Sequence, residues 1–300
     1  MEDSSQSNMD DDIQQSDDSP SGDAVLVAGL RIVGYGPKQL SRRTQTKRFK
    51  EHFGCRPHVC AIIWNDLKTG QHVPEKTTLD HLFWALFFLR KYPTEGDLAS
   101  RFQKDPITLR KWIWVLIFGI QELKADKIKL PEEGDRQLKF IVSVDGTDCR
   151  IHEPRPFSRK WFSQKFHGPA VKYEVAIDVL TGHCVWINGP FQGSKNDLTI
   201  FREGLMALIP EGFLVIADKA YKGEPTKVSF PNHLDELLIR RLKSRIRARQ
   251  ETFNARLKSF AVLDNPFRHK PVMDKHKACF EAVAVIVQYG IENGSPLFAI

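Results

Sequence analysis

The chain has 300 residues, of which 44 are Lys or Arg and 37 are Asp or Glu, giving a net charge of +7. This length fits one large or two modest domains, with ample material for a buried core. No apolar run approaches the roughly 18 residues of a membrane span, and the N-terminus is acidic. These features exclude a transmembrane protein and a signal peptide, and they predict an intracellular protein without membrane contact.

The charge is distributed unevenly along the chain. Residues 1–24 contain eight acids and no Lys or Arg, so they are predicted to form a disordered acidic tail. The other 276 residues hold all 44 basic residues and the remaining 29 acids, a surplus of +15. Such a surplus favours a polyanionic partner, nucleic acid above all. The alternative is a basic surface that only solvent covers.

The cysteines and a basic segment indicate in which cellular compartment the protein is expected. The five cysteines are odd in number and scattered, which is typical of a reducing environment. His52, Cys55, His58 and Cys60 share one short segment, where zinc is an alternative although the spacing matches no usual finger. The basic run in residues 38–50 is typical of a nuclear localisation signal or of an arm that contacts phosphate. We therefore expect the protein in the nucleus; the alternative is a solvated face.

Residues 25–130 are predicted to be helical. Apolar residues recur at helical spacing over residues 79–91, and a short helix is expected over residues 95–103. Asp105 then caps a longer helix that has Pro106 at its first position. This order is that of a helix-turn-helix, which predicts a DNA-binding region.

The third of these helices supports a second interpretation equally well. Most of its side chains are apolar, and only Arg110, Lys111 and Lys124 are expected to be free to contact DNA. The three helices therefore form either a DNA-reading unit or a purely structural bundle. Residues 130–135 are predicted to be a linker to the next region.

Residues 136–300 are predicted to form a mixed α/β domain. Two short apolar runs, residues 140–144 and 213–217, predict buried strands that end at Asp145 and Asp218. Strands that each deliver an aspartate at the C-terminal end bring both carboxylates into one crevice. A hairpin turn at Asp145 and a strand cap at Asp218 are the alternatives.

The elements between and after these strands complete a mixed sheet with flanking helices. Residues 171–179 and 183–188 predict a β-hairpin, and a helix is expected to start at Asp197. That helix is expected to turn four apolar side chains inward: Leu198, Phe201, Leu205 and Leu208. A long basic helix is expected over about residues 234–260.

The long basic helix contains a single acid, Glu251, among the eight basic residues of its stretch 240–258. Because alternating acids do not pair these bases, their counter-charge is expected to be external phosphate. Glu251 is either a salt-bridge partner or the third member of a carboxylate site with Asp145 and Asp218. Three carboxylates suit Mg²⁺ or Mn²⁺, and two such ions about 4 Å apart activate water and stabilise a leaving 3′ oxygen.

This helix is also expected to present two faces. Six apolar residues are predicted to pack onto the sheet: Leu234, Leu237, Leu238, Leu242, Phe253 and Leu257. Arg241, Arg245 and Arg249, spaced four apart, are predicted to form a stripe that follows a DNA backbone. The alternative is an arginine face that only solvent covers.

Four segments carry a family resemblance: VDGTDCRIHEP, GPFQGSKNDLTIF, LVIADKAY and RARQETFNARLKSFAVL. Together they resemble the PIF/Harbinger-type, IS5-like branch of the DDE transposases (DDE superfamily endonucleases) of plants and protists. The resemblance covers roughly residues 138–290. It implies an RNase H-like fold with catalytic metal ligands at Asp145, Asp218 and Glu251.

The resemblance also implies roles for further residues. Asp197 matches another aspartate of the family, which is either a metal ligand or a helix N-cap. Arg155 and Lys160 match basic residues after the first strand and are expected to hold DNA phosphate. A homo-oligomer when active and a second, element-encoded DNA-binding protein are the implied partners.

The resulting prediction is a metal-dependent DNA endonuclease and strand transferase. It cuts DNA at transposon ends and joins the freed 3′-hydroxyl to target DNA, using two Mg²⁺ or Mn²⁺ ions. One alternative is a domesticated DNA-binding protein on the same scaffold that does not transpose. Another is an RNase H-like nuclease that cuts strands and never joins them.

Overall fold

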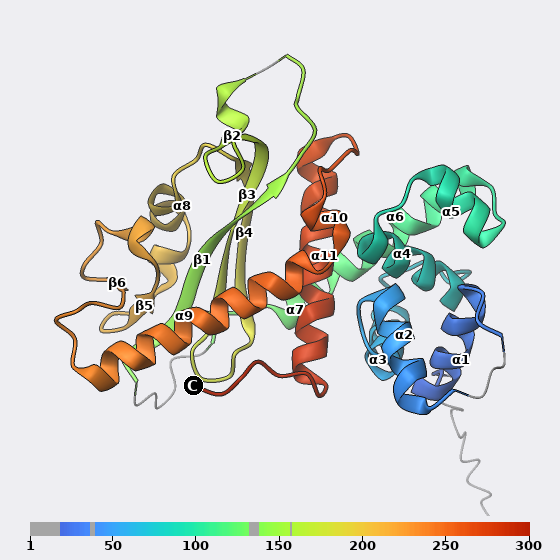
Figure 1. The fold of residues 1–300 in the computed structure, drawn as a ribbon, viewed down its shortest axis with the longest axis horizontal. Coiled ribbons are helices and arrows are strands. Elements are labelled where there is room, and N and C mark those ends of the chain that lie inside the picture. Colours follow the sequence, from blue (N-terminus) through green and yellow to red (C-terminus); the bar gives the residue numbers. More distant parts are fainter. Residues whose placement is uncertain (1–18, 37–39, 132–137, 157) are drawn as a thin grey trace, which may run out of the picture.

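The computed structural model describes residues 19–36, 40–131, 138–156 and 158–300. It contains an N-terminal helical region and an α/β region built on an open mixed sheet, shown side by side in Figure 1. Most of the predicted acidic tail and linker lies outside the described residues. The tail's predicted boundary at residue 24 is wrong, because α1 begins at Gly22 with Ser21 as its N-cap. Within the described part of the chain, no helix has both the length and the apolarity to cross a membrane.

Local capping signals define the helices of the N-terminal region. Their bounds are α1 (Gly22–Ile32), α2 (Arg42–Phe53), α3 (Pro57–Thr69), α4 (Leu79–Lys91), α5 (Glu95–Phe102), α6 (Pro106–Glu122) and α7 (Lys124–Lys127). Helices α4, α5 and α6 confirm the three that were predicted. Thr94 and Asp97 form a capping box at α5, and the Asp105 carboxylate accepts a hydrogen bond from the Thr108 amide at 3.0 Å at α6.

Two of the three basic side chains predicted to be free on or just after the third helix are paired. Arg110 donates from Nε to Glu95 Oε1 of α5 at 2.7 Å, and Lys124 Nζ lies 2.5 Å from Oε1 of Glu281. Glu281 belongs to α11 (Val272–Glu292), which runs between the sheet and the N-terminal helices in Figure 1. The buried core of the N-terminal helices continues across α11 to the sheet. The prediction that Arg110 and Lys124 are free is therefore wrong.

The sheet is mixed, as predicted. Its strands are β1 (Phe140–Arg150), β2 (Phe162–Ser163), β3 (Gly168–Asp178), β4 (Cys184–Gln192), β5 (Leu214–Ile216) and β6 (Val228–Ser229). The strand order is β2-β3-β1-β5-β6, and β4 also pairs with β3. Strand β3 pairs in antiparallel fashion with β1, β2 and β4, whereas β5 pairs in parallel with β1 and β6 in parallel with β5. The β3–β4 connection confirms the predicted hairpin and uses Gly182 at a φ of +75°.

Strand β1 is longer than the sequence predicted. It passes through Asp145 and Gly146 to Arg150, because β3 pairs with it along this whole length. The pairing of β5 with β1 extends as far as Ser143 opposite Ile216. The predicted strand end at Asp145 is therefore wrong: Asp145 lies within a strand, just past the point where its parallel neighbour stops.

Helices cover both faces of the sheet. The remaining elements are η1 (Arg159–Trp161), α8 (Asp197–Glu203), η2 (Leu205–Leu208), η3 (Lys219–Tyr221), α9 (Leu237–Lys258) and α10 (Ala261–Asp264). Helix α8 and η2 pack on one face, while α9 and α11 cover the other (Figure 1). The single helix predicted from Asp197 to Leu208 is interrupted at Gly204, and Leu208 is exposed rather than inward.

The basic helix α9 packs on the sheet through its second half. Phe253 and Leu257 are buried and Leu242 is half-buried, as predicted. The prediction is wrong for three other leucines, which are 80%, 52% and 74% exposed: Leu234, Leu237 and Leu238. Strands β5 and β6 are too short to lie beneath the first turns of α9, which extend past the sheet in Figure 1.

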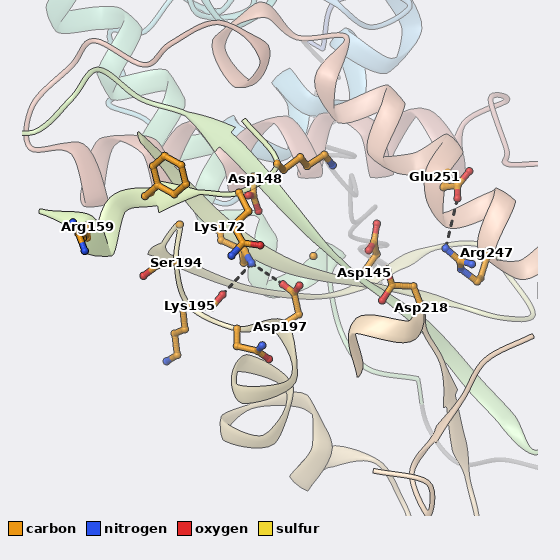
Figure 2. Close-up of a pocket in the computed structure, with 16 residues that line it drawn as sticks. Asp145, Asp148, Arg159, Lys172, Ser194, Lys195, Asp197, Asp218, Arg247 and Glu251 are labelled. Atoms are coloured by element: carbon orange, nitrogen blue, oxygen red, sulfur yellow. Dashed lines mark hydrogen bonds and ion pairs between the residues drawn. The ribbon is translucent and has the colours of Figure 1, made fainter. Parts of the chain in front are cut away.

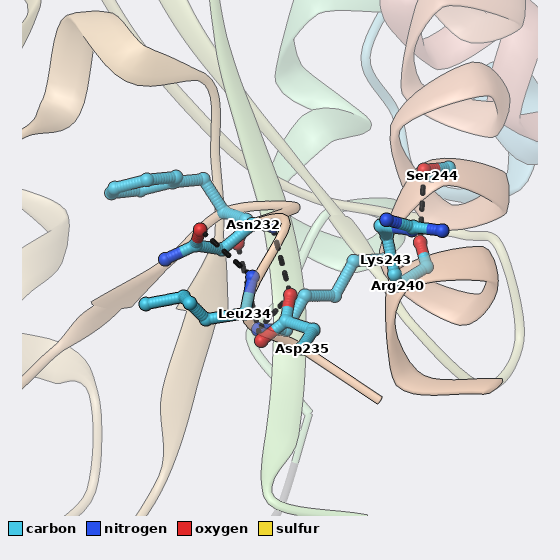
Figure 3. A network of polar contacts seen from close by, with 7 residues as sticks. Asn232, Leu234, Asp235, Arg240, Lys243 and Ser244 are labelled. Carbon is cyan, nitrogen blue, oxygen red and sulfur yellow. Dashed lines mark hydrogen bonds and ion pairs between the residues drawn. The ribbon is translucent and has the colours of Figure 1, made fainter. Parts of the chain in front are cut away.

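A polar network fixes the start of α9, which is shown in Figure 3. Lys243 Nζ donates to both carboxylate oxygens of Asp235, at 2.9 and 3.0 Å. The Asp235 carboxylate also accepts from the Asn232 amide at 2.9 Å. These contacts hold the loop before α9 by polar groups, so that Leu234 stays on the surface.

Candidate active site

A cavity of about 970 Å³ opens at the edge of β1 that β5 leaves unpaired. Acidic and basic side chains line it together: Asp145, Asp148, Asp197, Asp218, Glu251, Arg159, Lys165, Lys172, Lys195 and Arg247. The four acids singled out from the sequence are all among them. Figure 2 shows the lining of this cavity. The acids come from β1, the start of α8, the turn after β5 and α9, and the basic residues come from η1, β3, α9 and two turns that contain Lys165 and Lys195.

Asp145 and Asp218 lie side by side because of the parallel register of β1 and β5. Ser143 pairs with Ile216, and each aspartate follows its paired residue by two positions. Asp218 is fixed further by accepting a hydrogen bond from the Ala220 amide at 2.7 Å, where it caps the turn η3. The predicted meeting of the two carboxylates in one crevice is thus present, although β1 continues beyond Asp145.

The carboxyl group of Asp145 is difficult to ionise. Burial, with the nearby Asp218 carboxylate as the next cause, raises the pKa of Asp145 from 3.8 to about 7. Lys165 opposes this shift. A pair of carboxylates that repel each other in a half-buried site is a set of donors suited to a cation.

Asp197 lies against the same stretch of β1. A Cβ at Gly146 would come within 2.5 Å of Asp197 Oδ1, so this approach requires glycine at position 146. Lys172 Nζ lies 3.1 Å from Asp197 Oδ1 and also donates to the Lys195 carbonyl at 2.9 Å (Figure 2). The N-cap of α8 is Asn196, whose side chain accepts from the Leu198 amide. Asp197 is therefore the first helical residue and not the cap.

Helix α9 is fixed above this site by amide side chains. Gln250 accepts from Ser143 Oγ at 2.8 Å, and Asn254 Nδ2 donates to Asp145 Oδ2 at 2.7 Å. Glu251 lies between these two contacts in sequence and lines the same cavity, but its side chain is 70% exposed. Its Oε1 lies 3.9 Å from Nη2 of Arg247 (Figure 2). Glu251 therefore forms an ion pair with an arginine of its own helix, which is the first of the two roles considered for it from the sequence.

The carboxylates fit a divalent metal in part. Asp145 and Asp218 supply the hard oxygen donors that Mg²⁺ or Mn²⁺ prefers, and repulsion between them favours a cation. Within the described ranges, no three His, Cys, Asp or Glu side chains are grouped closely enough to hold a metal ion. Glu251 is therefore not grouped with Asp145 and Asp218 closely enough to share a metal ion with them. The His and Cys residues at 52–60 are likewise not arranged to hold zinc. Glu251 would have to turn from Arg247 towards the two aspartates to complete the site.

The residues predicted to bind DNA have different surroundings. Arg155 and Lys160 are exposed, as is Arg241. Arg245 donates to the Ala299 carbonyl at 2.8 Å. Arg249 is only 3% exposed and donates to the carbonyls of Asp178 and Val179. The predicted surface stripe is therefore wrong at Arg249, which serves the fold.

Several residues of the cavity were missed by sequence reasoning. Lys172 interrupts a buried strand, and Asp148 lies three positions after Asp145 on the same strand, where it accepts from Ser163 Oγ. A charged residue within an otherwise buried run is the signal that could have identified both. Arg159, Lys165 and Lys195 lie in turns and loops, where the sequence has no comparable signal.

Comparisons with known proteins concern the α/β region, which contains the cavity. Residues 144–288, which include Asp145, Asp197, Asp218 and Glu251, match the family model described as DDE superfamily endonuclease. A curated protein of Microchaete diplosiphon, a probable transposase for insertion sequence element IS702, is 27% identical over 162 residues. This match covers 49% of the chain and 55% of that relative, so the chain spans about half the relative's length. The region that forms the cavity is thus similar in sequence to the DDE superfamily endonucleases.

Proposed function

We propose that the chain is a DDE transposase of the PIF/Harbinger type with an RNase H-like catalytic region. It cleaves DNA phosphodiesters at transposon ends and transfers the freed 3′-hydroxyl to target DNA. The observation that carries the proposal is the Asp145–Asp218 pair at the open edge of β1, in a cavity that also holds five basic side chains. The match of residues 144–288 to DDE superfamily endonucleases supports it. Action in the nucleus, as a homo-oligomer with a second DNA-binding protein, belongs to the same proposal.

Each group of charged residues has a role in this proposal. Asp145, Asp218 and Glu251 would hold the divalent ions, with Asp197 adjacent. Two Mg²⁺ or Mn²⁺ ions bound there would supply the means to activate a water and to stabilise charge on the leaving 3′ oxygen. Basic residues around the acids bind the phosphates on either side of the cut: Arg159, Lys165, Lys172, Lys195 and Arg247.

A cleavage assay tests the proposal. We expect the protein to nick supercoiled plasmid in Mg²⁺ or Mn²⁺ but not in EDTA, and to join labelled 3′-hydroxyl ends of its own element to plasmid. Binding without cleavage would instead support the domesticated DNA-binding protein. Cleavage of element ends without joined products would support the nuclease that only cuts.

Metal binding is expected to depend on pH. At pH 6 the Asp145 carboxyl retains most of its proton, because its pKa is about 7, and a metal ion must displace that proton. Mn²⁺ should therefore raise the melting temperature more at pH 8 than at pH 6, each value being compared with the metal-free protein at the same pH. Differential scanning fluorimetry measures this shift. Equal shifts at both pH values would contradict the assignment of Asp145 as a ligand.

A further inference from the structure

A second basic pocket lies where the N-terminal helices meet the α/β region. It has a volume of about 440 Å³ and is lined by the end of α2, the start of α3, the end of α9 with the two residues after it, the second half of α11 and the segment after α11. Its basic side chains are Lys50, Arg56 and Arg256, and its described lining contains no acid. We call it the junction pocket.

Backbone carbonyls hold the two arginines of the junction pocket in place. Arg56 Nη1 donates to the Gly294 carbonyl at 3.0 Å, and Arg256 Nη2 donates to the Pro296 carbonyl at 2.9 Å. Carbonyl dipoles orient a guanidinium group but do not neutralise its charge. Both positive charges are therefore preorganised at the wall of the pocket, and no carboxylate among the described residues forms an ion pair with either of them.

Lys50 adds a third positive charge to the pocket. Its side chain is exposed, and within the described part of the chain it forms no hydrogen bond or ion pair. Partial burial of its stem is the first cause that lowers the pKa of Lys50, and repulsion from Arg56, Arg256 and Arg90 follows. The cations of the pocket therefore lie close enough to repel one another.

Other lysines of this protein form ion pairs with a nearby carboxylate. Lys47 lies on the same helix as Lys50 and pairs with Glu51 at 3.9 Å, while Lys127 pairs with Glu292 at 3.0 Å. At the junction pocket the corresponding anion is missing from the chain's described residues. A cluster of fixed positive charges beside a small cavity is suited to a phosphate group.

We propose that the junction pocket binds backbone phosphates of DNA at a second contact, separate from the cavity that holds Asp145 and Asp218. This inference rests on the proposed function, since it concerns the same substrate. Arg256 follows Glu251 by five residues, which places it about 7.5 Å further along α9 and roughly 140° around the helix. The bound DNA would therefore contact the N-terminal helices as well as the α/β region, through α2 and α3.

The test compares Lys50→Gln with the control Lys277→Gln, at an exposed lysine of α11 that lies outside the junction pocket. Binding of a fluorescein-labelled duplex is measured by anisotropy in EDTA, at several salt concentrations. We expect Lys50→Gln to weaken binding several-fold and to reduce the slope of log K against log salt by about 0.9, the value for one phosphate contact. Lys277→Gln should behave like the wild type, and both variants should keep its melting temperature because both side chains are exposed.

Three results would overturn the inference. If Lys50→Gln binds DNA as Lys277→Gln does while the wild type still cleaves DNA, the junction pocket is not a DNA contact and the proposed function stands. If pyrophosphate raises the melting temperature of the wild type but not of Lys50→Gln, and DNA affinity is unchanged, the pocket serves a free phosphate compound. If the wild type neither binds nor cleaves DNA, this inference and the proposed function fail together.

Discussion

Asp145→Asn is expected to abolish metal-dependent DNA cleavage while leaving the fold intact. A carboxamide lacks the negative charge that a divalent ion requires, and loss of several kcal/mol of charge stabilisation slows the reaction by at least about a hundredfold. Asn254 Nδ2, which donates to Asp145 Oδ2 at 2.7 Å, can still donate to the amide oxygen of the new side chain. The contact between β1 and α9 should therefore persist. Cleavage rates in Mn²⁺ measure the effect.

The same substitution is expected to stabilise the metal-free protein at pH 8. The pKa of Asp145 is about 7 in the folded state against 3.8 for the ordinary side chain, so the folded state retains its proton to higher pH than the unfolded chain does. Stability therefore falls as pH rises from about 4 to about 7, and the lost free energy is at most about 4 kcal/mol. An amide in place of the carboxyl group removes this penalty, which should appear as a higher melting temperature at pH 8 and little change at pH 4.

Asp126→Asn is the matched control, because Asp126 is exposed and pairs only with the neighbouring Lys129 among the described side chains, at 3.4 Å. It should change neither cleavage nor stability by a measurable amount. If Asp145→Asn still cleaved DNA at the wild-type rate, Asp145 would not be a catalytic metal ligand. A lower melting temperature at pH 8 would show that the carboxylate pair does not destabilise the fold.

The parts of the fold that the sequence predicted well are those with local causes. Thr94 with Asp97, and Asp105 with Pro106, define helix starts by contacts within a few residues, so the sequence alone locates them. The acids of the candidate site were found for a similar reason, since apolar runs lead directly to Asp145 and Asp218. That the two carboxylates lie side by side, however, depends on the register of β1 with β5, which the sequence does not show.

The wrong predictions concern tertiary contacts. Helical periodicity placed Leu234, Leu237 and Leu238 on an apolar face, but periodicity cannot show that the sheet ends before the first turns of α9. The four-residue spacing also placed Arg249 on the surface. The carbonyls that accept hydrogen bonds from its guanidinium lie about 70 residues earlier in the chain, so the spacing within the helix could not indicate them. In the same way, the geometry of Glu251 depends on Arg247, one helical turn away, as much as on the two distant aspartates.

The buried position of Arg249 leads to the second large expected effect: Arg249→Ala should lower the free energy of unfolding by about 2–4 kcal/mol. Its Nη2 donates to the Asp178 carbonyl at 2.9 Å and to the Val179 carbonyl at 2.5 Å, at the start of the turn between β3 and β4. Hydrogen bonds from a charged donor contribute more to stability than those between neutral groups. Removal of the buried guanidinium also takes one hydrogen bond from each of the two carbonyls, which costs further free energy. The midpoint of urea unfolding measures the loss.

Arg241→Ala distinguishes a structural arginine from a surface one on the same helix. Arg241 is exposed, so its removal should change stability by no more than about 0.5 kcal/mol. If Arg249 serves only the fold, the folded Arg249→Ala protein should also keep the wild-type salt slope for DNA binding, because no phosphate contact is lost. A variant of normal stability with a shallower salt slope would instead restore Arg249 to the DNA-binding surface. It would then follow that the helix rotates, or the β3–β4 turn opens, when DNA binds.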